Sequence, residues 1–300
     1  MRAAVFDRFG PPDVLRLADL PDPEPGPGQV RVRVRAAGVQ PFDVAVRRGR
    51  IAPVPVRFPQ QAGQEYAGVV DRLGAGVTGL AVGDPVLGST MLNGQATHVV
   101  VAAGTVVAKP PELDFPVAAA LVAAAQTASG ALRELGVGAG DVLLMHAAAG
   151  SVGTVATQLA LLAGATVIGT ASPANHAYLR QLGAIPVAYG DGLVPAVRAL
   201  APVSVALDAA GGQAIAQSVA LGVPPERIGT IVDDAAAAEH GARVVRAGRS
   251  PARLAEVIAL AARGLVTMPV RAYPLTAVAE AHAAVESRHG RGKVVLVVDG

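Results

Sequence analysis

The segment HAAAGSVG, which runs from His146 to Gly153, has the glycine spacing of a loop that brings backbone close to a phosphate. Ala148, Gly150 and Gly153 occupy the three places of a G-x-G-x-x-G pattern, with alanine in the first. The first place allows a tight turn, the second lets backbone approach a pyrophosphate, and the third lets a helix pack closely on a strand. The pattern alone is weak, because glycines that serve only helix packing would give the same spacing.

The segments on either side of this loop favour the binding interpretation. Residues 141–145 predict a strand before it, residues 151–163 predict a helix after it, and residues 166–170 predict a second strand. A strand, a glycine loop and a helix N-terminus in this order form a dinucleotide-binding fingerprint. The predicted pyrophosphate contacts are the loop residues Ala149, Gly150, Ser151, Val152 and Gly153.

The end of the second predicted strand indicates which dinucleotide binds. An NAD site usually has Asp or Glu about 20 residues into the fingerprint, where it bonds the ribose 2′-hydroxyl. Here the chain reads TASPANH and offers no acid. Ser172 and His176 can donate hydrogen bonds to a 2′-phosphate, and Arg180 can add positive charge. We therefore predict NADP(H) as the cofactor, although His176 could also be a solvated residue at a helix start.

Two regions with different patterns of predicted secondary structure must position these residues. Roughly the first 110 residues alternate short strand patterns with Gly and Pro punctuation, as in GQVRVRVRAAG, and predict an irregular β domain. From Pro116 onward, predicted helices and strands alternate with compact connections. Such alternation predicts an α/β fold with a doubly wound parallel sheet of the Rossmann type. A last helix and the strand GKVVLVVDG close the chain.

Composition excludes several classes of function. The chain has 300 residues, 52% of them hydrophobic, which allows a large core and one or two domains. A net charge of +2 without a basic tract argues against nucleic acid and favours small-molecule partners. The absence of Cys excludes disulfides, thiolate metal sites and thiol nucleophiles. Neither a signal peptide nor a membrane span is evident, so we expect a cytoplasmic protein that does not bind membranes.

Seven ordered motifs together resemble those of the medium-chain dehydrogenase/reductases, in the zinc-independent quinone oxidoreductase branch. They are AAGVQPFD, GQEYAGVVDRLGAGV, GDPVLG, AAQTASGAL, HAAAGSVGTVATQLA, GATVIGTAS and GRGKVVLVV. The resemblance implies a GroES-like domain built from both chain ends, at 1–117 and 267–300, and a Rossmann domain at 118–266. It also implies NADPH-dependent reduction of a quinone or of an α,β-unsaturated carbonyl.

The same resemblance assigns roles to single residues. Thr127 is similar to the family's threonine near the nicotinamide, and Ser172, His176 and Tyr189 are similar to its adenosine-phosphate pocket. Lys293 resembles the lysine of the family's closing strand. Zinc-dependent relatives have further cysteines and a G-H-E motif, whereas this chain has no Cys and reads GQE at residues 63–65. Because zinc needs three placed protein ligands around one open position, we predict no metal site.

The resemblance to the family does not identify which residue donates a proton to the substrate. The branch often has Asn where this chain has Gln40, and Tyr where it has Arg50 and Ile51. Gln40 is our first catalytic candidate, because an amide can donate to an enolate oxygen without titrating. It could instead cap backbone in a turn. Tyr66 is the second candidate, although an aromatic residue in an apolar strand is usually core.

Two other groups of polar residues have structural interpretations. Asp43 and Arg47, four residues apart on a predicted helical turn, favour a simple ion pair. Asp208 ends a predicted strand, where open α/β sheets bind ligands, yet it could equally cap the following loop.

The sequence also leaves other functions open and predicts how the chain assembles. The chain could be a polyketide-type enoyl reductase or tailoring enzyme, or an NADPH-binding sensor or structural protein with little turnover. The segments RIGTIV and ARVVRA predict an exposed sheet edge that pairs two chains into a homodimer. In the alternative, Arg243 and Arg246 blunt this edge and the protein is a monomer.

Overall fold

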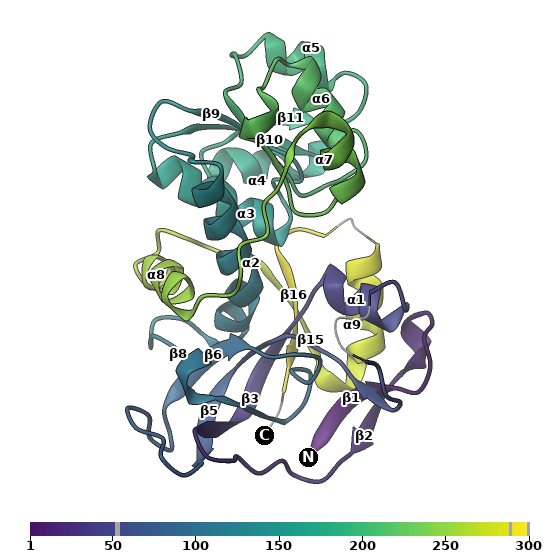
Figure 1. Cartoon of the computed structure of the whole chain (residues 1–300), viewed down its shortest axis with the longest axis vertical. Coiled ribbons are helices and arrows are strands. Elements are labelled where there is room, and N and C mark those ends of the chain that lie inside the picture. The colour runs from purple at the N-terminus through teal and green to yellow at the C-terminus, as the bar shows by residue number, and fades with distance from the viewer. Residues whose placement is uncertain (52–54, 288–289, 299–300) are drawn as a thin grey trace. The chain divides into compact units, whose positions relative to one another are not determined.

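The structure is a computed structural model that describes residues 1–51, 55–287 and 290–298 (Figure 1). By internal contacts the chain divides into two units. The first contains Met1–Ala123, Ser250–Ala262 and Met268–Gly300, and the second contains Ala124–Arg249 and Arg263–Thr267. The predicted domain boundaries stay a prediction, and these units differ from them chiefly at helix α8 (Pro251–Ala262), which contacts strand β8 (Val107–Ala108) of the first unit.

The described residues of the first unit form two sheets, and the larger sheet is built from both ends of the chain. Its seven strands run in the order β15-β16-β3-β5-β6-β8, with β7 also paired to β3. Strand β16, near the C-terminus, pairs antiparallel with β3 and parallel with β15. The GroES-like domain expected from both chain ends is thus confirmed. The bounds are β3 (Gln29–Val39), β5 (Glu65–Leu73), β6 (Pro85–Ser89), β7 (His98–Ala102), β15 (Val270–Pro274) and β16 (Lys293–Val297).

A smaller sheet and helices α1 (Pro41–Arg47) and α9 (Val278–Glu286) also belong to the first unit, in addition to α8. The sheet has the order β2-β1-β4, in which β1 (Arg2–Phe6) pairs antiparallel with both neighbours, β2 (Leu15–Asp19) and β4 (Gln60–Gln61). Helix α9 contacts α1 and strand β16 (Figure 1). The apolar faces of these elements form one core around buried valines of β3.

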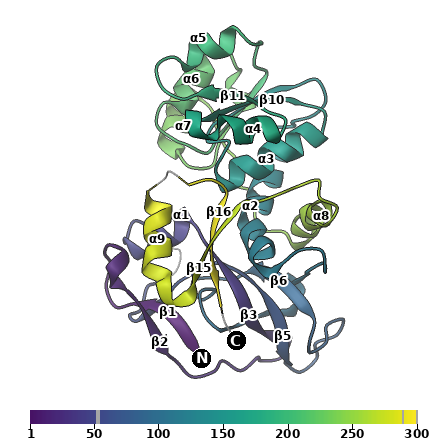
Figure 2. The same cartoon turned by 180° about the vertical axis from the view of Figure 1, so that it is seen from behind.

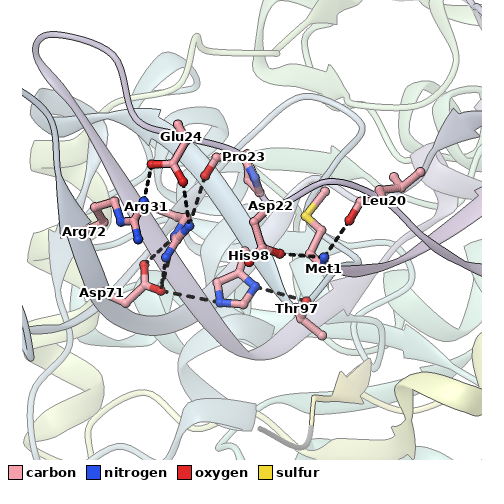
Figure 3. A network of polar contacts seen from close by, with 10 residues as sticks. All are labelled: Met1, Leu20, Asp22, Pro23, Glu24, Arg31, Asp71, Arg72, Thr97 and His98. Carbon is pink, nitrogen blue, oxygen red and sulfur yellow. Dashed lines mark hydrogen bonds and ion pairs between the residues drawn. The ribbon is translucent and has the colours of Figure 1, made fainter.

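Arginines alternate with valines along β3, and one of them is buried because acids surround it. Arg31 is 7% exposed and donates to both carboxylate oxygens of Asp71 on β5, with its Nη2 2.9 Å from Oδ2 (Figure 3). Glu24 lies 3.6 Å from another nitrogen of the same guanidinium, and His98 Nε2 lies 3.5 Å from Asp71. A buried guanidinium needs such partners, since an unpaired buried charge is costly.

The second unit is a doubly wound parallel sheet of the Rossmann type, as predicted. Its strand order is β11-β10-β9-β12-β13-β14, and all five pairings are parallel. In chain order this is 3-2-1-4-5-6, so the direction of winding reverses between β9 and β12, where such sheets bind ligands at their carboxyl ends. The strands are β9 (Val142–Met145), β10 (Thr166–Ala171), β11 (Ile185–Ala188), β12 (Val205–Asp208), β13 (Ile228–Thr230) and β14 (Arg243–Val244).

Short helices connect these strands and flank the sheet (Figure 2). Helix α3 contacts β9 and β10, α4 contacts β11, and α6 contacts β12 and β13. The helices are α3 (Ser151–Leu162), α4 (His176–Gln181), α5 (Leu193–Arg198), α6 (Ala214–Ala220) and α7 (Asp234–His240). Buried apolar residues of α5, α6 and α7 form a core cluster of this unit together with Leu144 and Ile168 of the central strands.

Helix α2 (Phe115–Glu134) corrects one expectation from the sequence. Its 20 residues are long and apolar enough to cross a membrane by length and composition, although no such run was expected. However, 78% of its most apolar window is buried inside the structure. The alanine-rich helix is apolar because protein surrounds it, which is the pattern of a core helix.

A buried ionic cluster between α1 and α9 makes stability depend on pH. Arg47 is fully buried and pairs with Glu286, and Arg48 binds the same carboxylate at 2.7 and 2.9 Å. These bonds lower the pKa of Glu286 to about 2. Burial, with the nearby Arg47 charge, lowers the pKa of His282 to about 3. Arg47 therefore has a partner other than the expected Asp43, whose Oδ2 accepts the Gln40 amide at 2.9 Å.

We expect the free energy of unfolding to decrease as pH falls from neutral toward 3. Both pKa values are lowered in the folded state, so the unfolded chain binds more protons and acid favours it. Loss begins near the unfolded pKa of His282, about 6.5, and continues below that of Glu286, about 4.3. Urea unfolding at several pH values measures this slope. Glu286→Gln should reduce the slope below pH 5, while Asp19→Asn at an exposed position should change it little. An unchanged slope in Glu286→Gln would contradict the account.

Candidate active site

The turn from β9 into α3 crosses the sheet at its reversal point. The His146 amide donates to Leu207 on β12 at 2.9 Å, whereas the Ala148 amide donates to Thr170 on β10 at 3.0 Å. Ala147, between them, has a left-handed φ of 58°. Its amide donates to the Thr170 hydroxyl at 3.1 Å. The hydrogen bonds of the backbone thus change from β12 to β10 within two residues. As a result, the N-terminus of α3 lies at the carboxyl edge of the sheet.

The two glycines of this loop have different reasons to be glycine. A Cβ on Gly153 would lie 2.3 Å from the Ala147 oxygen, so close packing of α3 on the loop requires glycine there. A Cβ on Gly150 would meet only the Ala147 oxygen at 3.4 Å, an ordinary contact, and Gly150 has a φ of −73°. The protein itself therefore does not require glycine at position 150, which suits a place kept open for a ligand.

The N-terminus of α3 is ready to bind an anion. Gly150 is its N-cap and provides no side chain, and no acidic residue lies in the first turn. Helix geometry leaves the amides of Ser151, Val152 and Gly153 without intrahelical acceptors. These amides and the helix dipole both favour negative charge. The structure thus places the predicted loop at the N-terminus of α3, and phosphate binding there stays a prediction.

Alanine in the first place of the loop is accommodated by the neighbouring strand. The Ala148 Cβ faces Gly169 on β10, where an added Cβ would lie only 2.8 Å away. Because Gly169 has no side chain, it leaves room for the Cβ of Ala148, so position 148 does not need to be glycine. The departure from the usual pattern does not disturb the loop.

Three of the predicted cofactor residues meet at the ends of β10 and β11. Ala171 and Ala188 are paired in register, so Ser172 and Tyr189, which follow them, lie at the same edge. Ser172 is half-buried, and its hydroxyl accepts from Asn175 at 3.4 Å. His176 lies 3.3 Å from the Ala171 oxygen through Nε2, so its ring is held at this edge. Tyr189 is 64% exposed.

The polar groups beside the reversal point are structural or unassigned. Asp208 is buried and accepts both the Ala210 and Gly211 amides at 2.8 Å. It also accepts the Thr230 hydroxyl at 2.7 Å, so it caps its loop, one of the two interpretations left open. Thr127 is half-buried on α2 beside the buried Gln126. The sequence pattern indicates no role for His146, whose hydrogen bonds depend on the fold.

In the first unit, Gln40 and Gln64 form a pair of side-chain amides. Gln40 is the N-cap of α1, and its Nε2 donates to Gln64 Oε1 at 3.0 Å. Gln64 in turn lies 3.4 Å from the sulfur of Met91 through its own Nε2. A primary amide has two N–H groups, so Gln40 keeps one donor beyond this bond. The side chain does more than cap the helix.

Tyr66 and Lys293 are both buried in the first unit, and the roles predicted for them stay predictions. Tyr66 is fully buried in the core of the first unit, and its hydroxyl is a buried atom without a partner among the described residues. Burial raises its pKa, which opposes proton transfer. Lys293 is 4% exposed and pairs with the buried Glu65, whose other oxygen accepts the Ala123 amide at 2.7 Å. These contacts give both residues a structural role in the unit.

Two family models match the chain. Residues 26–111 match the alcohol dehydrogenase GroES-like domain, and residues 182–296 match the zinc-binding dehydrogenase model. The quinone oxidoreductase of Coxiella burnetii superposes with a TM-score of 0.90 at 32% identity, covering 100% of this chain and 99% of that one. The chain belongs to the medium-chain dehydrogenase/reductase superfamily, in the quinone oxidoreductase branch.

Two further proteins are similar to this medium-chain dehydrogenase/reductase. A mycobacterial protein solved in complex with NADPH has a TM-score of 0.85 at 27% identity, covering 99% of this chain and 100% of that one. The spectinabilin polyketide synthase protein NorB of Streptomyces orinoci is 36% identical over 88% of this chain. The chain spans only 13% of NorB and about half the length of the mammalian quinone oxidoreductases that it also matches.

We expect this medium-chain dehydrogenase/reductase to contain no stoichiometric zinc after purification. It has no Cys, and Gln64 occupies the middle of the GQE motif, where an amide is a poor zinc ligand. Within residues 1–51, 55–287 and 290–298, no three His, Cys, Asp or Glu side chains could jointly hold a metal. Elemental analysis and activity after dialysis against EDTA check this. One zinc per chain, lost together with activity, would overturn it.

Proposed function

We propose that the protein transfers hydride from NADPH to a quinone or to the activated C=C of an α,β-unsaturated carbonyl, without zinc. One observation carries the cofactor assignment. The uncapped N-terminus of α3, open at Gly150, lies on the same sheet edge as Ser172, His176 and Tyr189, and this edge offers no acid in the TASPANH segment. A phosphate at the helix and a second phosphate at the strand ends fit these donors.

The chain's own residues would bind and orient the dinucleotide. Amides of the α3 N-terminus would hold the pyrophosphate, and Ser172, His176 and Tyr189 would hold the 2′-phosphate through hydrogen bonds. When bound, the nicotinamide supplies the hydride, so the protein contributes mainly position and electrostatics. Thr127 stays a candidate for contact near the nicotinamide, as the family resemblance implies.

Gln40 is the proposed donor to the developing oxyanion. Hydride addition at the β-carbon leaves an enolate, which needs hydrogen-bond donors at its oxygen. The Gln64 bond fixes the Gln40 amide, and its second N–H remains for a substrate oxygen. An amide does not release a proton at neutral pH, so water would protonate the α-carbon.

A polyketide-type enoyl reductase is the second candidate. The similarity to NorB covers most of this chain and lies within a much longer polyketide synthase protein. An enoyl thioester is itself an activated C=C compound, so the same residues would serve it. An NADPH-binding protein with little turnover is the third candidate, and the burial of Tyr66, which leaves few proton donors, supports it.

Oxidation of NADPH with a panel of a quinone, a simple enone and an enoyl thioester tests these candidates. We expect turnover with at least one acceptor. Gln40→Leu should lower kcat at least tenfold while the Kd for NADPH stays within about twofold, because Gln40 contacts substrate only. The matched control is Gln60→Leu on β4. Tight NADPH binding without turnover on any acceptor would favour the sensor function and reject the reductase.

We further propose a homodimer through strand β14. This strand ends the sheet, and Val244 is 43% exposed. The Val245 amide donates inward to Thr230 at 2.9 Å, so in a parallel pair the Val244 amide points to the free edge. Arg243 donates a hydrogen bond to the backbone oxygen of Glu134, and Arg246 binds the Asp234 carboxylate. Both arginines therefore have partners within the chain, which argues against a role only in blocking edge pairing.

Val244→Pro should dissociate this dimer without unfolding the sheet. Proline removes the outward amide and leaves the inward bond of Val245 in place. Light scattering at micromolar concentration should find a dimer for the parent protein and a monomer for the variant. A proline control at another exposed valine, Val219→Pro, would break helix α6, in which Val219 lies. The control is therefore Val232→Ser, which replaces an exposed apolar residue outside strand β14. A parent protein that is only monomeric would reject the proposal.

A further inference from the structure

His146 is buried at the point where the winding of the sheet reverses. It follows β9 directly, is 2% exposed, and its amide continues the pairing with β12 through Leu207. Its ring turns toward α6, where Nε2 lies 3.0 Å from the Ser218 hydroxyl. A buried histidine at the carboxyl edge of the central strand is in the region where doubly wound sheets bind ligands.

Ser218 fixes the tautomer of this ring. Its hydroxyl donates to the Ala214 oxygen at 2.8 Å, so its single hydrogen is already used. It can then only accept from His146, which places the ring proton on Nε2 and leaves a lone pair on Nδ1. Burial agrees with a neutral ring, because it lowers the pKa of His146 to about 4 against the opposing effect of Asp208.

The Nδ1 atom of His146 is an acceptor that the chain leaves unused. No hydrogen bond to it occurs among the described residues. It is also absent from the fully enclosed atoms without partners, a group that does include the Nδ1 of His282. An unpartnered acceptor that is buried at a ligand edge but not fully enclosed is suited to a ligand hydroxyl or N–H.

The position of the other site residues indicates which part of the dinucleotide passes His146. Ser172 and Tyr189 lie on the β10–β11 side of the α3 loop, and His146 lies on its β12 side. With the pyrophosphate on the loop and the adenosine phosphate on the β10–β11 side, the remaining half of a bound cofactor would lie toward β12. That half carries ribose hydroxyls and a carboxamide, both of which donate hydrogen bonds.

We propose that His146 is a positioning residue whose Nδ1 accepts a hydrogen bond from the nicotinamide–ribose half of the cofactor, with Ser218 holding the ring. This inference rests on the proposed function. It assigns one end of the dinucleotide to the β12 side of the loop. It also gives a reason for a buried histidine at a place where an apolar side chain would fill the core equally well.

Two ligands and two isosteric variants test the proposal. NADPH contains both halves of the dinucleotide, whereas 2′,5′-ADP lacks the nicotinamide–ribose half. His146→Gln keeps an amide near the Nε2 position and loses the acceptor at Nδ1, and His146→Asn places an amide oxygen near Nδ1. Calorimetry should show at least tenfold weaker NADPH binding by His146→Gln, with 2′,5′-ADP unchanged, and recovery to within about threefold by His146→Asn.

The possible outcomes separate the two hypotheses. Parent protein that binds neither ligand would reject the proposed function. Parent protein that binds both, with His146→Gln binding NADPH normally or losing both ligands equally, would reject the role of His146 alone. If His146→Gln does not fold, as judged by its thermal midpoint, Ser218→Ala keeps the histidine and frees its ring. That variant should also weaken NADPH and spare 2′,5′-ADP, and equal NADPH affinity in it would overturn the proposal.

Discussion

Gly150→Val should abolish measurable NADPH binding in a protein that still folds. The Gly150 backbone has a φ of −73°, which other residues adopt, and an added Cβ meets only one atom at ordinary contact distance. The folded protein should therefore tolerate the change at about 1 kcal/mol, the cost of a poor N-cap residue. The branched side chain would instead occupy the space above the free amides of α3. We expect at least a hundredfold weaker NADPH binding by calorimetry.

Gly153→Ala is the matched control, because it changes the same loop in the opposite way. Its Cβ would lie 2.3 Å from the Ala147 oxygen and 2.6 Å from the Ala148 Cα, so loop and helix must move apart. We expect a lower thermal midpoint for this variant with or without NADPH. Gly150→Val should keep its circular dichroism spectrum and a midpoint near the parent value. Retained NADPH affinity in Gly150→Val would mean that the loop serves packing alone.

Ser172→Asp should change the preference between cofactors. The carboxylate would face the 2′-phosphate of NADPH, and like charges placed together cost about 2 kcal/mol or more, roughly thirtyfold in affinity. NADH lacks this phosphate and has a 2′-hydroxyl, which a carboxylate accepts from. We expect weaker NADPH binding and unchanged or improved NADH binding, measured by titration of both cofactors into the same preparation.

Structure at position 172 makes this variant a clean test. Ser172 precedes the short helix η3 (Pro173–Asn175) and accepts from Asn175, and Asp can accept in the same way. Ser172→Ala serves as the control, because it removes the donor without adding charge and should weaken NADPH only modestly. Equal affinities of the parent protein for NADPH and NADH would contradict the proposed preference for NADPH.

The sequence by itself determined the features that depend on local pattern. The order of strand, glycine loop and helix follows from residues close in sequence, and the alternation from Pro116 onward specifies a parallel Rossmann sheet. The missing acid in TASPANH is likewise readable without a fold. Joining of both chain ends into one β domain came from the family resemblance, since no local pattern states which distant strands pair.

The tertiary structure decided the role of each single side chain. Tyr66 lies in an apolar strand whichever role it has, and only the packing of the sheets shows that its hydroxyl is enclosed. Lys293 and Glu65 are 228 positions apart in the chain, yet β16 brings them into one buried ion pair. Arg47 pairs with Glu286 on a distant helix, while its near neighbour Asp43 caps the Gln40 amide.

The two loop glycines show the same division most clearly. In the sequence Gly150 and Gly153 are equivalent members of one motif. In the fold an added Cβ would clash at Gly153 and meet almost nothing at Gly150. Likewise, the partner that sets the proton on His146 is Ser218, 72 positions away. Sequence pattern specifies which backbone forms, whereas burial, hydrogen-bond partners and open space depend on atoms that only the folded chain brings together.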